Sequence, residues 1–127
     1  MLPRLRVAVD PCRVSAYLDV VGMIGLWRRA VAEAGGDAGR VGGHADIAES
    51  SIMLTMHPEL VHAELAAAGS PGDAVGRAAR PDSSRRAAKH LPNGIIGDAR
   101  GLSAAIGERC VDVVAEAIVT DFRAEMD

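Results

Sequence analysis

The spacing of apolar residues predicts one short strand followed by a series of helices. Residues 5–9 are mostly apolar and β-branched and stop at Asp10, which predicts a short buried strand. Apolar positions three and four residues apart predict helices over about 22–34, 45–57, 59–68 and 102–124. Gly35 and Gly36 end the first of these helices, and Ser103 can cap the last one.

The segments between these helices differ from them in composition. Residues 39–43 are predicted to form a loop, and residues 93–98 a glycine-bounded turn around two isoleucines. Residues 69–92 combine glycine, proline and serine with basic side chains and predict a flexible basic loop within a single domain spanning 1–127. The predicted core consists of Val7, Val9, Ile24, Trp27, Val31, Ile52, Met53, Met56, Ile106, Val113 and Ala117.

The composition indicates a folded chain with a thin core. Apolar residues make up 49% of the 127 residues, which excludes a disordered chain. Tyr17, Trp27 and Phe122 are the only aromatic residues, so the core hides little area per residue. We therefore expect an oligomer or an incomplete domain. The net charge of −3 argues against nucleic acid as a partner, because a strong positive field is lacking.

The cysteines and the apolar runs bear on location. Cys12 and Cys110 lie far apart and form no CxxC pair, which indicates neither a zinc knuckle nor a disulfide scaffold. A reduced, cytoplasmic protein is the expectation. The chain begins without a signal-peptide pattern, and its longest apolar stretch, 20–27, is too short to span a bilayer. We expect no membrane partner.

His44 and Glu49 form the most informative pair of polar residues. On a helix, the carboxylate of Glu49 shares one face with Ile52, Met53, Met56 and Leu60. A carboxylate in line with apolar residues needs a cation, a metal or hydrogen bonds as its partner. His44 can approach Glu49 only from the loop before the first helical turn, and Gly42 and Gly43 make that conformation accessible.

A structural interpretation of the same residues is also open. Asp46 can act as the N-cap of the helix, with Glu49 reaching back three residues later in a box-like arrangement. His44 would then be an ordinary surface histidine. Spacing alone does not decide between the two interpretations.

Two motifs resemble the creatininase family of amidohydrolases. Residues 44–54, followed by 58–61, are similar to the family pattern of His-Ala-Gly, two variable residues, Glu-Thr-Ser, a hydrophobic helix and Pro-(Asp/Glu)-Leu-Val. Residues 94–100 resemble the family's Gly-Val-x-Gly-Asp-Pro loop, and the two motifs stand in the family order. The chain departs from the pattern at Asp46, where the family has glycine, at Ser50 for threonine, and at Ala99 for proline.

The resemblance implies an α/β fold: a three-layer creatininase-like sandwich with a mainly parallel sheet, here incomplete and limited to the C-terminal half. It implies hydrolysis of C–N bonds in small cyclic amides or formamides, at a centre with divalent zinc, manganese or iron. Carried over by motif position, His44 would be the catalytic acid or base or a substrate-contacting histidine, and Glu49 would be a metal ligand or a carboxylate just behind the metal ligands. Substrate or loop support falls to Gly43, Asp46, Gly97 and Asp98.

The family's other ligand-bearing segments, an early Glu-x-His and a central Asn-Gly-His-Gly-Gly-Asn, do not occur in this sequence. His57, His62 and His90 are expected to be surface histidines rather than replacements. We expect the isolated chain to bind metal weakly and to hydrolyse little. The expected partner is either further copies of the chain in a homo-oligomer or a second polypeptide that supplies the missing half. The alternatives are a catalytically inactive, oligomeric structural or interaction module, a short homologue with different chemistry, and an anion-binding module using the basic residues of 77–89.

Overall fold

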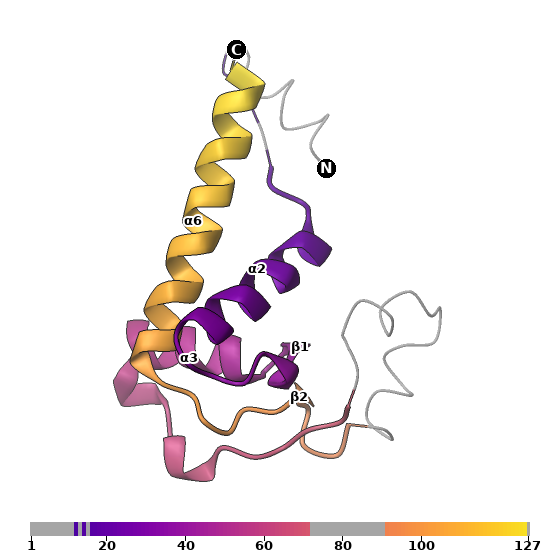
Figure 1. Ribbon diagram of the computed structural model, residues 1–127, viewed down its shortest axis with the longest axis vertical. Helices are drawn as coiled ribbons and strands as arrows, with labels where there is room; N and C mark the ends of the chain where they lie inside the picture. Colours follow the sequence, from indigo (N-terminus) through magenta and orange to yellow (C-terminus); the bar gives the residue numbers. More distant parts are fainter. Residues whose placement is uncertain (1–11, 13, 15, 72–90, 127) are drawn as a thin grey trace.

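The computed structural model describes residues 12, 14, 16–71 and 91–126, and three helices dominate that part of the chain (Figure 1). In chain order the elements are α2 (Val20–Glu33), η1 (Ala38–Arg40), β1 (Val41–His44), α3 (Ile47–Met56), η2 (Pro58–Leu60), η3 (Ala63–Leu65), β2 (Ile96–Gly97) and α6 (Ala104–Met126). Both α2 and α3 pack against α6. The predicted strand at 5–9 and the basic run at 77–89, with His90, lie outside the described residues.

Helix α2 forms where its pattern predicts it. The Asp19 carboxylate caps its first turn by accepting from the Gly22 N–H at 2.8 Å. At the other end Gly35 has a φ of 81°, and the Gly36 N–H donates to the Val31 carbonyl at 2.8 Å. This is a Schellman-type ending, which requires the left-handed conformation that glycine adopts without strain.

Helix α6 crosses α3 at very short range. A Cβ on Gly107 would lie 2.1 Å from the Ser51 carbonyl oxygen, so only glycine fits at this crossing. The Ser103 N–H donates to Ser51 Oγ at 3.1 Å, and Thr55 Oγ1 donates to the Ala104 carbonyl at 3.0 Å. Ser103 Oγ accepts from the first turn of α6, as predicted.

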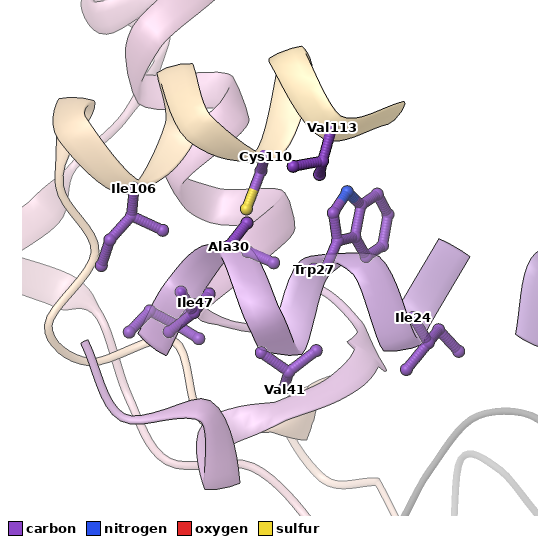
Figure 2. Packing of buried hydrophobic residues seen from close by; sticks show 10 residues of the cluster. Ile24, Trp27, Ala30, Val41, Ile47, Ile106, Cys110 and Val113 are labelled. Carbon is purple, nitrogen blue, oxygen red and sulfur yellow. The ribbon is translucent and has the colours of Figure 1, made fainter. Parts of the chain in front are cut away.

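The core lies between α2, α3, β1 and the first half of α6 (Figure 2). The predicted core positions Ile24, Trp27, Val31, Ile106 and Val113 are buried, whereas Ile52 and Ala117 are half-buried. The core also includes Ala30, Val41, Ile47, Ala48, Ile96, Ala99 and Cys110. The predicted core residues Val7 and Val9 lie outside the described residues.

The predicted inner face of α3 is wrong. Met53 and Met56 are 42% and 60% exposed, while Ala48 and Ser51 are fully buried. The close crossing at Gly107 explains the difference, because only small residues of α3 fit against α6 there. The larger methionines therefore point away from the core.

The predicted helix over 59–68 is also wrong. The segment forms only the single 3-10 turns η2 and η3, and Leu60 and Leu65 stay exposed. The end of the segment pairs with the residues after β2 instead: the Ala99 N–H donates to the Ala67 carbonyl at 3.0 Å, and Ala68 forms an antiparallel bridge with Asp98. Pairing with the segment around β2 thus replaces the last part of the predicted helix.

The predicted loop at 39–43 overlaps strand β1, and the predicted turn at 93–98 contains strand β2. The two strands pair antiparallel with a bulge between Val41 and His44. A Cβ on Gly42 would lie 2.3 Å from the Ile96 carbonyl oxygen, so the strands approach each other through glycine. The α/β class is therefore confirmed. The named strand pair among the described residues is antiparallel, and the mainly parallel three-layer sandwich stays a prediction.

The face of α6 that points away from the core is partly apolar. The outer face of α6 comprises Val111, Ile118, Val119 and Phe122, which are 37–48% exposed. The C-terminal end of the helix extends past α2 and α3 (Figure 1). Over the described ranges, none of the helices combines the length and the apolar content needed to cross a membrane.

Candidate functional site

The β1–α3 junction, which we define as residues 42–49, brings the predicted site residues together. Gly43 has a φ of 91° and Ala45 a φ of 53°, so His44 lies between two residues with left-handed backbone. This conformation suits glycine but is costly for alanine. The chain therefore turns sharply at the end of β1, and His44 precedes the first turn of α3, as the convergence with Glu49 required.

Asp46 is the N-cap of α3 and its side chain is fully buried. Its Oδ1 accepts from the Ala48 N–H at 2.8 Å and the Glu49 N–H at 3.3 Å. Its Oδ2 accepts from the Gly42 N–H at 2.8 Å and the Gly43 N–H at 2.6 Å. The predicted capping role is confirmed, and the same carboxylate also binds the end of β1.

Glu49 turns back toward the loop before the helix. Its Oε2 accepts from the Ala45 N–H and lies 3.9 Å from His44 Nδ1. In a capping box, Glu49 would accept from the N–H of the N-cap residue itself. Here it accepts from the residue before the N-cap, and its carboxylate also lies near His44. The structure thus contains both the helix cap and the approach of His44 to Glu49.

The His44–Glu49 pair is accessible to solvent. The side chain of His44 is 60% exposed and that of Glu49 37%. The predicted partner of the carboxylate is the Ala45 N–H, and the imidazole lies near it without a direct hydrogen bond. Because Met53 and Met56 are exposed further along α3, the pair stands at one end of an exposed rather than a buried apolar stripe.

Gly97, on β2, packs directly against the backbone of the junction. It has a φ of 107°, and a Cβ there would lie 2.4 Å from the Arg40 carbonyl oxygen and 2.7 Å from the Gly42 nitrogen. The same Cβ would lie 3.1 Å from Asp46 Cβ. Gly97 thus allows β2 to lie directly against the segment that carries His44.

Asp98 fixes the loop after β2 and is not part of the His44–Glu49 pair. Its Oδ2 accepts from Arg100 Nη2 at 2.6 Å, and its backbone N–H donates to the Arg40 carbonyl at 2.9 Å. The hydrogen bonds from Arg100 are the largest effect on this carboxyl group and lower its pKa to about 2. Loop support is the role that this geometry favours for Asp98.

Two supporting contacts were not predicted from the sequence. Arg28 Nε and Nη2 both donate to the Val41 carbonyl at 3.2 Å, so a cation from α2 holds β1. Cys110 is buried beside the junction, and desolvation, together with the charge of Asp46, raises the pKa of its thiol to about 11. Cys110 lies on the apolar side of helix α6, which indicates a core residue but not its place beside the junction. No local pattern indicated the contact of Arg28.

The donor set does not fit a two-metal centre. Over the described residues, no three His, Cys, Asp or Glu side chains converge as metal ligands would. Asp46 is committed to backbone N–H groups, which leaves one imidazole and one carboxylate at the junction. His57 and His62 are exposed and each lies 3.4 Å from a neighbouring glutamate on a 3-10 turn, as expected for surface histidines.

Comparison with known families settles the ancestry of the chain. The family model for creatininase, described as creatinine amidohydrolase, matches residues 4–122. The chain therefore belongs to the creatininase family, which is generally metal-dependent. Among curated proteins and among solved structures, none matches this chain.

Proposed function

We propose that this chain forms part of a creatininase-like amidohydrolase that cleaves C–N bonds in small cyclic amides or formamides. Family membership supports an amidohydrolase-like function. The observation that carries the proposal is the His44–Glu49 pair, which lies on the family's histidine and glutamate motif with Nδ1 and Oε2 3.9 Å apart.

The pair suits the proton transfer that amide cleavage requires. The nitrogen that leaves must receive a proton, and an imidazole can supply it near neutral pH. With the Glu49 carboxylate on the Nδ1 side, the Nε2 atom of His44 is left for a substrate. The 60% exposure of His44 gives a small molecule access to that nitrogen.

We further propose that the family's metal dependence is met by ligands from outside the described residues. A second polypeptide that carries the family's other ligand segments is the proposed source, and zinc, manganese or iron the proposed ion. Glu49 is the carboxylate that this chain would contribute. The exposed Met53 and Met56 support an association at this surface, since contiguous exposed apolar residues often mark interaction sites.

A second candidate function is an oligomeric module without catalysis. The outer face of α6 favours it, because Ile118 and Phe122 are 44% and 48% exposed and belong to a helix end beyond the junction. Association through this face would need neither His44 nor Glu49. Such a protein would keep its assembly when both site residues are replaced.

Complementation tests the proposed function. The purified chain is assayed with creatinine and an N-formyl amide, with zinc, manganese or iron, alone and mixed with the ligand-bearing half of a creatininase-family enzyme. We expect little hydrolysis by either part and clear hydrolysis by the mixture. A mixture that binds metal and forms a complex yet hydrolyses neither substrate contradicts the proposal and favours the inactive module.

A further inference from the structure

One buried carboxylate joins the two segments that carry the candidate site. The Oδ2 atom of Asp46 binds the end of β1 through the Gly42 and Gly43 N–H groups, at 2.8 and 2.6 Å. Its Oδ1 atom binds the first turn of α3 through the Ala48 and Glu49 N–H groups. His44 and Ala45 lie between these two anchored segments.

The conformation of the loop depends on being held at both ends. Among the described residues, Ala45 is the non-glycine residue with positive φ, at 53°. A non-glycine residue keeps such a backbone only where its surroundings hold it. Here Asp46 binds the segments on both sides of Ala45, and Glu49 accepts from the Ala45 N–H. Releasing the Gly42–Gly43 side would free the loop that places His44.

The geometry points to Asp46 as the positioning residue of the His44–Glu49 pair, a role that rests on the proposed function. Asp46 itself faces backbone N–H groups and is fully buried, so it acts through the two residues that it orients rather than on a substrate. The family pattern has glycine at this position. The arrangement is therefore a feature of this chain and is not carried over from the family motif.

An asparagine separates helix capping from loop anchoring. Asparagine caps helices about as well as aspartate, so in Asp46→Asn the side-chain oxygen can keep the Ala48 and Glu49 N–H groups. Its NH₂ group, however, cannot accept from Gly42 and Gly43. Asp19→Asn is the matched control, because Asp19 caps α2 with one bond to Gly22 and anchors no second segment.

The experiment compares the full chain with Asp46→Asn and Asp19→Asn by amide hydrogen exchange and by NOEs between the His44 and Glu49 side chains. In Asp46→Asn we expect exchange at Gly42 and Gly43 to rise at least about tenfold and the NOEs to weaken, with exchange at Ala48 changing less than about twofold. Asp19→Asn should leave all three readouts unchanged. Unchanged exchange at both glycines, or retained NOEs in Asp46→Asn, would overturn the inference.

The complemented hydrolysis assay separates this role from the proposed function. A positioning role predicts that Asp46→Asn lowers kcat at least about tenfold with KM nearly unchanged, because alignment of the pair is lost and substrate contacts are kept. If His44→Gln abolishes hydrolysis while Asp46→Asn retains full kcat, the positioning role is wrong and the proposed function stands. If the wild-type mixture is inactive, the proposed function fails, and the exchange and NOE results still decide whether Asp46 orients the pair.

Discussion

At the β1–α3 junction, short-range hydrogen bonds anchor the chain, whereas the outer face of α6 carries apolar side chains that are 37–48% exposed. Asp46 alone accepts from four backbone N–H groups at the junction. On α6, Ile118 and Phe122 remain nearly half exposed. The difference shows that hydrogen bonds within residues 42–49, supported by Gly97 and Arg28, hold the candidate site, while the small core leaves apolar side chains of the longest helix partly exposed.

The largest expected loss of stability comes from a substitution that disrupts the β1–α3 junction. In Gly97→Ala the added Cβ would meet the Arg40 carbonyl oxygen at 2.4 Å in a backbone with φ of 107°. We expect a loss of about 4 kcal/mol in the free energy of unfolding, from overpacking and left-handed strain together. Urea denaturation measures it. Gly25→Ala is the control, since nothing lies within 4 Å of that Cβ, and it should stabilise the chain by about 0.5–1 kcal/mol.

Replacing isoleucine by alanine should destabilise the fold much more on the inner face of α6 than on its outer face. Ile106 is 3% exposed and packs in the core, so Ile106→Ala should cost about 3 kcal/mol in the free energy of unfolding. Ile118 is 44% exposed, and Ile118→Ala should cost less than about 0.5 kcal/mol in the dilute chain. Equal losses for the two variants would show that the outer face is covered in solution.

The Asp98–Arg100 contact predicts a pH dependence of stability. Because Arg100 lowers the folded-state pKa of Asp98 from 3.8 to about 2, the contact stabilises the fold above pH 4 and loses its effect as the pH falls toward 2. We expect a contribution of about 1 kcal/mol, since Arg100 is 57% exposed and screening weakens the pair. Unfolding of wild type and Asp98→Asn across pH 2–6 measures it. A constant difference between the two over that range contradicts the prediction.

The smallest effect concerns the anchor of β1. Arg28 donates through Nε and Nη2 to the Val41 carbonyl, and lysine can replace only part of this contact. Arg28→Lys should lower the free energy of unfolding by about 0.5–1 kcal/mol. Arg29→Lys, at an exposed pair with Glu33, is the control and should change it by less than about 0.3 kcal/mol. A larger effect for Arg29 than for Arg28 would contradict the assigned anchor.

The parts of the fold that the sequence predicts are those with local signals. Helices α2 and α6 have long apolar patterns and clear ends, at Gly35 and Ser103, and both form. The strands β1 and β2 were missed because they are short and glycine-rich, and their pairing is set by a contact between residues 42 and 96 that no local pattern contains. The orientation of α3 was missed for a similar reason, since Gly107 selects which face can approach α6.

The candidate site was predictable in part. The family motif indicated His44 and Glu49, and the spacing indicated Asp46 as a cap, and the structure places all three at the junction. The bonds from Gly42 and Gly43 to Asp46 could not be predicted, because they depend on the left-handed backbone at Gly43 and Ala45. The catalytic role of His44 and the metal role of Glu49 stay predictions.

The central claim, that His44 acts in amide cleavage, is tested most directly by comparing two histidines in the complemented hydrolysis assay. His44 and His57 are both exposed, and each lies beside a glutamate, but only His44 belongs to the family motif. We predict that His44→Gln lowers kcat at least about a hundredfold and that His57→Gln leaves it within about twofold. Equal activity of the two variants would contradict the account.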